Sequence, residues 1–476
     1  MQNKLLLEKI CKSSCAVLGF GISNRPLVDF LLENGAKDIT VHDKKPIEEL
    51  SDKAIEFQKR GVKFVTGESY LDVIDADVIF RSPGIRDDKG GIPSAVARGA
   101  MLTSEMELFF ALTPAKIIAV TGSDGKTTTT TLTSKILGLE LEQKGVGKVY
   151  VGGNIGEPLL PYVKDMTDKD FAVVELSSFQ LKTMKQSPWR AVITNLSPNH
   201  LDWHTDMDEY VESKKNICAH KEITRLVTNA ENAVTAKLAS EHHGALTLFS
   251  SKRGDYAELA SENVHAVYEK DGVICLFDGH KVHEILKTEK ILLLGRHNVE
   301  NYMAAIAVLE GLVSIESIRK IAVSFGGVEH RLEFVRELDG VRYINSSIDS
   351  SPSRTAAALS ALDQKPIIIC GGYDKHIPFD GLGKTLCERA KAVVLTGATA
   401  AQIREAIDGA GMPIPPVYHE PDFTQAVKLC RTIAEKGDIV LLSPACASFD
   451  AFPNFEQRGR YFKKIVTEMD ENHGTV

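Results

Sequence analysis

A glycine-containing turn joins a buried strand to a threonine-rich helix in the segment AKIIAVTGSDGKTTTTTLTSKIL. Backbone N–H groups in such a turn point at a phosphate, and the helix N-terminus adds a favourable potential. Lys126 can then reach the outer phosphate oxygens, and the Thr127 hydroxyl can bind Mg²⁺. Val120 occupies the first glycine position of the strict phosphate-loop pattern, so an ordinary glycine turn is the alternative. The order of strand, turn and helix favours a nucleotide site.

Three further polar side chains follow in the same region of the chain. Glu175 ends the apolar strand FAVVE, and His200 comes shortly after the strand AVITN. The carboxyl ends of parallel strands are where α/β sheets bind their ligands, and Glu175 can hold Mg²⁺ through oxygen. A lone histidine, however, is more often structural than a ligand. Lys214, in YVESKKNI, would by itself be an ordinary surface lysine.

A second glycine pattern, GFGISN, lies near the N-terminus and matches half of a dinucleotide fingerprint. Asn24 stands where the third glycine would be. Asp43 ends the next strand, close to where a ribose-binding acid would lie, and Lys44 and Lys45 follow it. An acid beside two lysines suits a nucleotide or a sugar phosphate better than a bare ribose. Binding of NAD is the alternative.

Strand-like and helical runs alternate along the whole chain, which predicts an α/β protein with parallel sheets covered by helices. CAVLGFG, DITVHD, VKFVTG and DADVIFRSPGI read as strands of a first region, and PIIICGGYD, AVVLTGA and DIVLLSPACAS as strands of a last one. Between them, LTLFSS, VHAVYEKDGVICLFDG and KVHEIL are typical of an antiparallel segment. We expect three α/β domains, over residues 1–97, 98–327 and 328–476.

The chain has 476 residues, a hydrophobic fraction of 43% and a formal net charge of −8. An acidic balance argues against nucleic acid as a partner, because phosphate backbones are bound by basic faces. No apolar stretch approaches the ~18 residues that span a membrane, and the N-terminus lacks a signal-peptide pattern. The eight cysteines form no closely spaced framework, which favours reduced thiols. We expect a cytoplasmic protein without a membrane partner, and a monomer.

Taken together and in this order, the motifs resemble those of the Mur ligase family, and the resemblance covers nearly the whole chain. The segments that carry it are GFGISN, RSPGI, TGSDGKTTT, GGNIGEP, ELSSFQL, NLSPNHLDWH, YVESKKNI, GRHNVEN, EHRLEF, GGYDK and LSPACASFDAFPNFEQRGRYF. The GKT and NHLD segments are typical of the family as a whole. The last segment resembles the branch of the family that adds D-glutamate.

The resemblance implies a Rossmann-like N-terminal domain for a UDP substrate, a P-loop-like central ATPase domain, and a Rossmann-like C-terminal domain for the amino acid. It also implies an activity: an ATP-dependent ligase that adds D-glutamate to UDP-N-acetylmuramoyl-L-alanine through an acyl phosphate, in peptidoglycan synthesis. The implied cofactors are ATP and two Mg²⁺ ions. Carbamylation of Lys214 would turn this cation into an oxygen ligand for a metal ion.

The resemblance further implies roles for single residues. The expected UDP contacts are Ile22, Ser23, Asp43, Lys44, Lys45 and Gly84. The expected contacts with the muramoyl substrate are Asn154, Ser177 and Gln180. The expected ATP contacts are Gly122, Ser123, Asp124, Gly125, Lys126, Thr127, Thr128, Asn298, Asn301 and Arg331. The expected metal ligands are Thr127, Glu175, His200 and Lys214. The expected D-glutamate contacts are Ser350, Lys375, Ser448 and Phe455.

The sequence departs from the family pattern at a few positions. Asp124 stands where asparagine is common, so we expect its side chain to point away from the phosphates or to cap the helix. Ser346 and Ile348 replace the acid and the lysine of a usual Asn-Asp-Ser-Lys pattern, and Arg354 is the candidate for the missing cation. The expected ATP and glutamate contacts of this segment depend on that substitution.

Other functions fit parts of the sequence. A ligase for diaminopimelate, lysine or folate-linked glutamate would share the GKT segment, but the DNPR-type motif is absent and the FEQRG segment argues against it. A non-catalytic UDP-sugar or ATP-binding regulator would bind without turnover. A nicotinamide oxidoreductase would leave the GKT segment unexplained.

Overall fold

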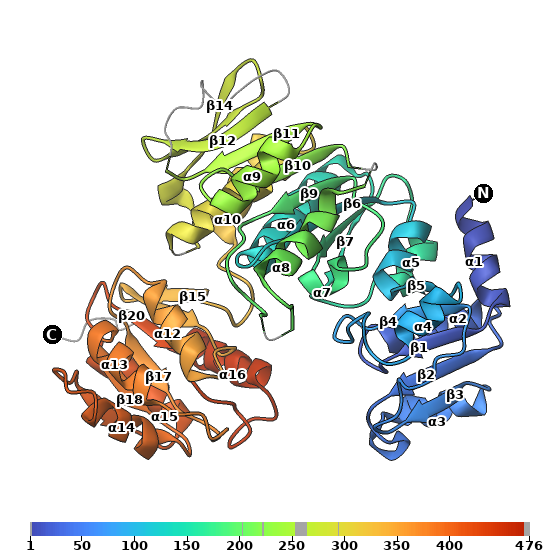
Figure 1. Ribbon diagram of the computed structural model, residues 1–476. Coiled ribbons are helices and arrows are strands. Elements are labelled where there is room, and N and C mark those ends of the chain that lie inside the picture. The colour runs from blue at the N-terminus through green and yellow to red at the C-terminus, as the bar shows by residue number, and fades with distance from the viewer. Residues whose placement is uncertain (1, 202, 221–222, 253–263, 294, 471–476) are drawn as a thin grey trace. The chain divides into compact units, whose positions relative to one another are not determined.

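The computed structural model describes residues 2–201, 203–220, 223–252, 264–293 and 295–470. It divides into two compact units, Met1–Thr288 with Glu300–Ile321, and Glu289–Val299 with Ala322–Val476. Helices accompany each of three sheets, which confirms the predicted α/β class (Figure 1). The boundaries expected near residues 97 and 327 stay predictions. No helix in the described ranges is both long enough and apolar enough to cross a membrane.

The first sheet of the first unit is parallel throughout, in the order β3-β2-β1-β4-β5. Its strands are β1 (Cys15–Leu18), β2 (Ile39–Asp43), β3 (Lys63–Thr66), β4 (Val78–Arg81) and β5 (Met101–Thr103), and its helices are α1 (Gln2–Lys12), α2 (Asn24–Glu33), α3 (Asp52–Lys59), α4 (Ile92–Ala97) and α5 (Glu105–Leu112). The strand order reverses between β1 and β4, and Rossmann-like sheets bind ligands at the carboxyl ends of the strands at such a point.

The second sheet of this unit has the order β14-β13-β12-β11-β10-β9-β6-β8-β7. Its strands are β6 (Lys116–Thr121), β7 (Val149–Gly153), β8 (Phe171–Glu175), β9 (Arg190–Ile193), β10 (Arg225–Asn229), β11 (Leu246–Ser250), β12 (Val264–Lys270), β13 (Val273–Phe277) and β14 (Val282–Lys287). The expected antiparallel segment is confirmed for β12 to β14. It is wrong for β11, which pairs in parallel with β10 and β12.

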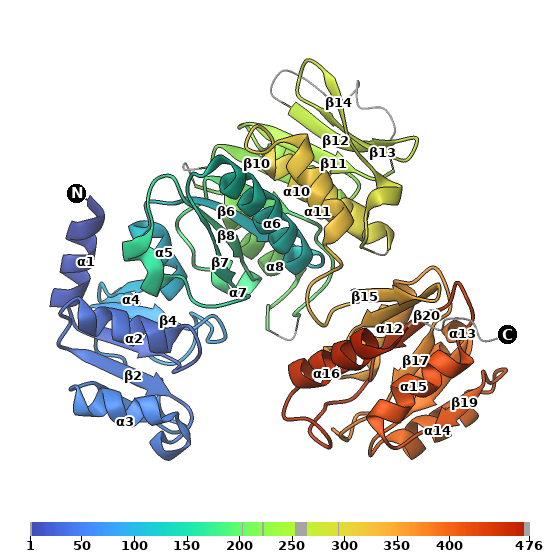
Figure 2. The same cartoon turned by 180° about the vertical axis from the view of Figure 1, so that it is seen from behind.

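Helices lie on both faces of the second sheet. They are α6 (Lys126–Lys144), α7 (Ser178–Leu181), α8 (Met207–Lys215), α9 (Ala233–Glu241), α10 (Arg296–Leu309) and α11 (Ile315–Ser324). Figure 2 shows α6 and α11 on one face, whereas α8 and α9 lie on the other face in Figure 1. Short 3-10 helices occur at Ile47–Glu49, Leu160–Asp165, Asn216–Cys218 and Thr288–Lys290.

The second unit contains a sheet with the order β15-β16-β20-β17-β18-β19, antiparallel only between β15 and β16. Its strands are β15 (Glu333–Leu338), β16 (Val341–Asn345), β17 (Ile367–Cys370), β18 (Ala392–Leu395), β19 (Val417–His419) and β20 (Ile439–Leu442), and its helices are α12 (Pro352–Ser360), α13 (Asp380–Arg389), α14 (Ala400–Asp408), α15 (Phe423–Ile433) and α16 (Phe455–Glu468).

The central strands of this sheet are apolar on both faces. Ile368 and Cys370 pack with α13 and α14, whereas Ile367 and Ile369 pack with α15 and α16. Successive side chains of a strand point to opposite faces, so a continuous apolar run such as IIIC is typical of a strand covered on both sides. The β-strands predicted from PIIICGGYD, AVVLTGA and DIVLLSPACAS are confirmed.

A glycine in α13 sets how closely this helix approaches α14. A Cβ atom on Gly383 would lie 2.1 Å from the carbonyl oxygen of Ala406, whereas a Cβ on Gly381 in the same helix would meet nothing within 4 Å. We expect Gly383→Ala to lower the free energy of unfolding by about 1–3 kcal/mol through overpacking. Gly381→Ala is the matched control and should be neutral or stabilising by up to about 1 kcal/mol. Thermal unfolding of the two variants checks this, and equal midpoints would contradict the close contact.

Candidate active site

The phosphate-type loop connects β6 to α6 and holds two glycines in conformations that other residues rarely adopt. Gly122 has a φ of 147° and Gly125 a φ of 76°. A Cβ atom on Gly122 would lie 1.9 Å from the Thr194 hydroxyl oxygen, and one on Gly125 would lie 2.3 Å from the Asn301 amide oxygen. Glycine is therefore required at both positions by backbone conformation and by space. The loop ends directly at the N-terminus of α6, where backbone N–H groups can receive an anion.

The other side chains of the loop differ in their environment. Ser123 is buried, lies 2.7 Å from the Tyr210 hydroxyl and donates to the Ser197 carbonyl, so it supports the shape of the loop. The amine of Lys126 donates to the Ser123 carbonyl at 2.8 Å. Thr128 lies half-buried in the first turn of α6.

Asp124 has an exposed side chain, and its backbone N–H donates to the Asn195 amide oxygen at 3.0 Å. The residue at the N-cap position of α6 is Gly125, and no side chain caps this helix. The expectation that Asp124 caps α6 is therefore wrong. The side chain is exposed, and the other expectation, that the carboxylate points away from the phosphates, stays a prediction.

Glu175 is the centre of the polar contacts at the strand ends. The Thr127 hydroxyl donates to one of its carboxylate oxygens at 2.7 Å, and the Asn154 amide donates to the other at 2.9 Å. Glu175 is buried at the end of β8, which lies between β6 and β7 in the sheet. The parallel order thus brings together side chains that the sequence places far apart. Their oxygen atoms are the kind of ligand that Mg²⁺ prefers.

Lys214 reaches the same place from α8. It is 2% exposed, and its amine donates to the Thr121 hydroxyl at 3.1 Å. Burial, together with the positive charge of Lys126, lowers the pKa of Lys214 to about 7, although Glu175 opposes the shift. Because the charged form is disfavoured, much of this amine is neutral near neutral pH. The surface-lysine alternative is therefore wrong for this residue.

His200 is exposed and has a φ of 54°, and its ring lies 4.9 Å from that of Phe179. Within the described ranges, no group of three or more His, Cys, Asp or Glu side chains is arranged to hold a metal ion. The expected metal ligands include a threonine and a modified lysine, which are side chains of other types. The metal set stays a prediction.

Asn298 and Asn301 are both buried in α10. The Asn301 amide oxygen accepts a hydrogen bond from the Thr129 hydroxyl at 3.2 Å. This contact, together with its approach to Gly125, puts Asn301 against the loop and the first turns of α6. The expected contact of both residues with adenine stays a prediction.

The expected UDP residues lie at the carboxyl ends of β1, β2 and β4. Asp43 accepts the backbone N–H groups of Phe20 and Lys45, at 2.6 and 2.9 Å, and so ties the glycine turn to the end of β2. Lys44 forms an exposed ion pair with Glu68 at 3.2 Å. The remaining members are Ile22, which is 77% exposed, Ser23 at the N-cap position of α2, Lys45, which is exposed, and Gly84, which has open space around its Cα.

Ser177 and Gln180 form a reciprocal capping box at the start of α7. The Ser177 hydroxyl accepts the Gln180 N–H, and the Gln180 side-chain oxygen accepts the Ser177 N–H at 2.9 Å. Both residues are buried. They orient the segment that follows Glu175, and their expected contact with the substrate stays a prediction.

In the second unit, three of the expected D-glutamate residues, Ser350, Lys375 and Ser448, lie on loops at the carboxyl ends of strands. The Lys375 amine donates to the Ser350 carbonyl at 3.4 Å. Phe455 begins α16, and its carbonyl accepts the hydroxyl of Ser347. Ser448 is buried in the loop after β20. Arg331, expected at the γ-phosphate, is exposed.

Arg458 holds these loops together, and sequence reasoning gave it no role. Arg458 is 3% exposed, and its guanidinium group donates to the hydroxyl and carbonyl of Ser347 and to the carbonyls of Cys446 and Ala447. A buried arginine is stable only when its N–H groups have partners. The signal in the sequence was the arginine within FEQRG, but its partners are too distant in sequence to be recognised.

The segment that departs from the family pattern has its own polar contacts. The Ser346 hydroxyl accepts the N–H of Leu332 at 3.1 Å, and Arg354 donates to the Ile348 carbonyl at 3.2 Å. Asp349 is buried and accepts the hydroxyl of Ser443 at 2.8 Å. Arg354 therefore lies beside the position of the missing lysine, and its compensating role stays a prediction.

Family models match most of the chain: the MurD N-terminal domain over residues 14–90, the Mur ligase middle domain over 120–309, and the glutamate ligase domain of Mur ligases over 330–446. A protein of Clostridium novyi is 48% identical over 460 residues, which cover 95% of this chain and 96% of the relative. The chain belongs to the Mur ligase family.

The Clostridium novyi protein is named UDP-N-acetylmuramoylalanine–D-glutamate ligase. Relatives with the same name occur in Clostridium beijerinckii, 46% identical over 97% of this chain and 98% of the relative, and in Acetivibrio thermocellus, 45% identical over 97% and 98%. Among solved structures, UDP-N-acetylmuramoyl-L-alanyl-D-glutamate–2,6-diaminopimelate ligase has a TM-score of 0.54 at 17% identity, covering 95% of this chain and 92% of that one. E. coli FolC in complex with DHPP and ADP has a TM-score of 0.51 at 18% identity, covering 77% and 93%. These two likenesses support the fold alone.

The buried carboxyl group of Asp349 predicts a pH-dependent contribution to stability. Burial raises the pKa of Asp349 to about 6 from 3.8, against the opposing effects of Ser346, Ser443, Arg354 and Arg331. The folded state therefore holds this proton more tightly, and the associated stability, present below about pH 4, is lost as the pH rises through about 6.

Asp349→Asn keeps an oxygen that can accept the Ser443 hydroxyl but has no charge to bury. We expect it to raise the free energy of unfolding by about 1–3 kcal/mol at about pH 8, and to have little effect at about pH 4. The measurement is the midpoint of thermal unfolding as a function of pH, with the exposed Asp363→Asn as control. Parallel pH profiles for Asp349→Asn and the wild type would contradict the raised pKa.

Proposed function

We propose that this protein is an ATP-dependent ligase that adds D-glutamate to UDP-N-acetylmuramoyl-L-alanine in peptidoglycan precursor synthesis. The observation that carries the proposal is the identity of 45–48% to ligases of that name over nearly the whole of both chains. The loop between β6 and α6, with Thr127 against Glu175, adds the geometry that phosphate chemistry needs.

The proposed reaction has two chemical steps. The alanine carboxylate of the UDP substrate attacks the γ-phosphorus of ATP, which gives an acyl phosphate and ADP. The amine of D-glutamate then attacks the acyl carbon, phosphate leaves, and the amine loses a proton. Both partners of the first step are anions, so the residues around the phosphates must offset their repulsion and stabilise the transferred group.

Lys126 and the N–H groups at the start of α6 are the positive groups that the loop supplies for the ATP phosphates. We assign the remaining ATP contacts to Thr128, Asn298 and Asn301, and the γ-phosphate to Arg331. Thr127, Glu175, His200 and Lys214 would hold Mg²⁺, which when bound adds positive charge beside the phosphates. The carboxylate and hydroxyl contacts at Glu175 support a site for such a hard cation.

The remaining expected residues are assigned to the two substrates, the UDP substrate and D-glutamate. We propose that the UDP substrate binds along the carboxyl ends of β1, β2 and β4 through the expected residues Ile22, Ser23, Asp43, Lys44, Lys45 and Gly84, with Asn154, Ser177 and Gln180 near its reacting end. D-glutamate is assigned to Ser350, Lys375, Ser448 and Phe455. The link between Lys375 and Ser350 supports a shared pocket for two of these residues.

We also propose that the protein works as a monomer in the cytoplasm, on a nucleotide-linked sugar rather than on nucleic acid or a membrane. All eight cysteines lie in the described part of the chain, and none forms a disulfide. Reduced thiols support a reducing compartment.

Phosphate release should require one particular amino acid. With ATP, Mg²⁺ and UDP-N-acetylmuramoyl-L-alanine present, we expect release when D-glutamate is added, and none with L-glutamate, lysine or diaminopimelate. Thr127→Val should lower the rate on the order of 10²-fold, because it removes a hydroxyl from the phosphate site. Release with another amino acid would overturn the assigned acceptor. Nucleotide binding without release for any amino acid would support a regulator instead.

Lys214 should carry a carbamate formed when its neutral amine attacks CO₂ and loses a proton to solvent. The matched control is its neighbour Lys215, which is partly exposed and pairs with Glu241 at 3.0 Å, so that its pKa is raised rather than lowered. With carbon-13 bicarbonate, NMR should detect a carbamate signal in the wild type and in Lys215→Ala, but not in Lys214→Ala. Activity should fall only in Lys214→Ala. A signal that survives Lys214→Ala would assign the modification elsewhere.

A further inference from the structure

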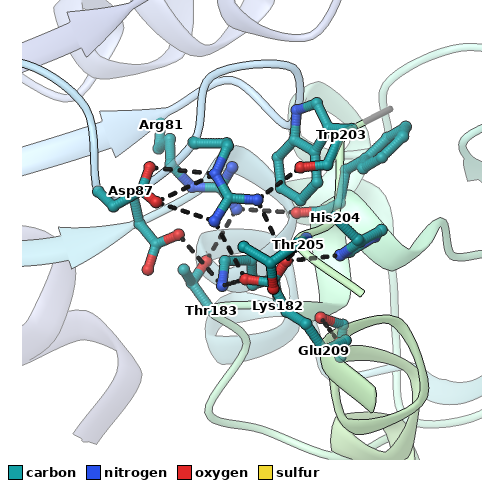
Figure 3. A network of polar contacts seen from close by, with 12 residues as sticks. Arg81, Asp87, Lys182, Thr183, Trp203, His204, Thr205 and Glu209 are labelled. Atoms are coloured by element: carbon teal, nitrogen blue, oxygen red, sulfur yellow. Dashed lines mark hydrogen bonds and ion pairs between the residues drawn. The ribbon is translucent and has the colours of Figure 1, made fainter. Parts of the chain in front are cut away.

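Five residues of the first unit belong to one network of polar contacts, which we call the arginine clamp: Arg81, Arg86, Lys182, Trp203 and Glu209. Figure 3 labels four of them, Arg81, Lys182, Trp203 and Glu209. Arg81 ends β4, and Arg86 lies in the loop that follows it. The other three residues lie in the segment that leads from α7 into α8. The clamp therefore joins the five-stranded sheet to helices that belong to the nine-stranded sheet.

Arg86 makes the most contacts in the clamp. Its two terminal nitrogens donate to the two carboxylate oxygens of Glu209, each at 3.1 Å, and one of them also donates to the Trp203 carbonyl at 2.5 Å. The guanidinium group lies over the Trp203 ring, 5.1 Å from its centroid. The side chains of Arg86 and Glu209 are only 13% and 18% exposed. A two-pronged, largely buried pair of this kind fixes orientation as well as distance.

Two other residues of the clamp, Trp203 and Arg81, hold the loop that carries Gly84. The Trp203 indole N–H donates to the Gly84 carbonyl at 3.2 Å. Arg81, which is 1% exposed, donates to the Ile85 carbonyl at 2.6 Å and, through its other terminal nitrogen, to the Phe179 carbonyl at 2.8 Å. The loop after β4 is thus fixed by Arg81 from its own strand and by Trp203 from the segment that precedes α8.

On its other side, the clamp fixes α8. Glu209 accepts the Lys182 amine at 2.6 Å and the Thr205 N–H at 2.8 Å, and it lies in the first turn of α8. Tyr210, the next residue, contacts Ser123 of the phosphate-type loop, and Lys214 follows further along the same helix. Because the helix is short and hydrogen-bonded, a shift at Glu209 moves Tyr210 and Lys214 with it.

We propose that Arg86 is a positioning residue that couples binding of the UDP substrate at the loop after β4 to the placement of α8 beside the ATP loop. This inference rests on the proposed function, because the contact between Gly84 and the UDP substrate is part of that proposal. Bound substrate restricts the loop after β4, and Arg86 in this loop then holds Glu209 at the start of α8. The fixed helix in turn holds Tyr210 and Lys214 in place. Arg86 would act through its contacts with Trp203 and Glu209 rather than on the reacting atoms.

Coupling of this kind is reciprocal, so each ligand must tighten the other by the same factor. We expect UDP-N-acetylmuramoyl-L-alanine to tighten binding of a non-hydrolysable ATP analogue by about tenfold in the wild type, within the usual range for coupled sites. Arg86→Met should lower this factor to about threefold or less. The affinity for either ligand alone should change less than the coupling factor does.

The experiment is titration calorimetry of each ligand with and without the other. The matched control is Arg98→Met, since Arg98 is exposed at the end of α4 and donates to the carbonyl of Ile74, in the loop before β4, at 2.9 Å. Its coupling factor should equal that of the wild type. Trp203→Phe removes the N–H that donates to the Gly84 carbonyl but keeps an aromatic ring, and it should also weaken the coupling. This variant replaces Arg86→Met in the test if Arg86→Met does not fold.

An unchanged coupling factor in folded Arg86→Met and Trp203→Phe would overturn the proposal. A wild type that binds both ligands without coupling would do the same. Neither result bears on the proposed reaction, which is tested separately by phosphate release with D-glutamate. If the wild type releases no phosphate with D-glutamate, that result contradicts the proposed function instead.

Discussion

The burial of Glu175 at the end of β8 is the constraint on which the candidate active site depends. A buried carboxylate is tolerated only with hydrogen-bond donors around it, and here they come from Thr127 and Asn154. One donor lies in the first turn of α6 and the other follows β7, so the neighbouring parallel strands must end at the same level. The positions of the phosphate-type loop and of Lys214 follow from this arrangement of strands.

The buried site beside Glu175 can hold a lysine because the neutral form of its amine is favoured there. Lys214 lies in a buried site close to the positive charge of Lys126, so its cationic form is disfavoured. Lys215, one residue on, is partly exposed and paired with a carboxylate, and it keeps its charge. The pKa values of two adjacent lysines on one helix are thus shifted in opposite directions, because one side chain is buried and the other is paired with a carboxylate near the surface.

Much of the fold could be predicted from the sequence, because apolar runs and glycine turns are local signals. The strands β1 to β4 and the loop with Gly122 and Gly125 belong to this group. The parallel pairing of β11 could not be predicted, because a short apolar strand does not reveal its partner. Arg86 and Glu209 are 123 residues apart in sequence, and the link of Arg458 to Ser347 is of the same long-range kind. Such contacts depend on tertiary packing, which residue spacing does not encode.

The order of bond formation is the central claim, and transfer of oxygen tests it most directly. UDP-N-acetylmuramoyl-L-alanine would be prepared with oxygen-18 in its alanine carboxylate and converted with ATP, Mg²⁺ and D-glutamate. If the carboxylate attacks the γ-phosphorus, one labelled oxygen must leave with inorganic phosphate and the other must remain in the new amide. Mass spectrometry or phosphorus NMR of the released phosphate reads out the label. Labelled phosphate is the predicted result, and unlabelled phosphate formed together with the amide product would contradict the acyl phosphate route.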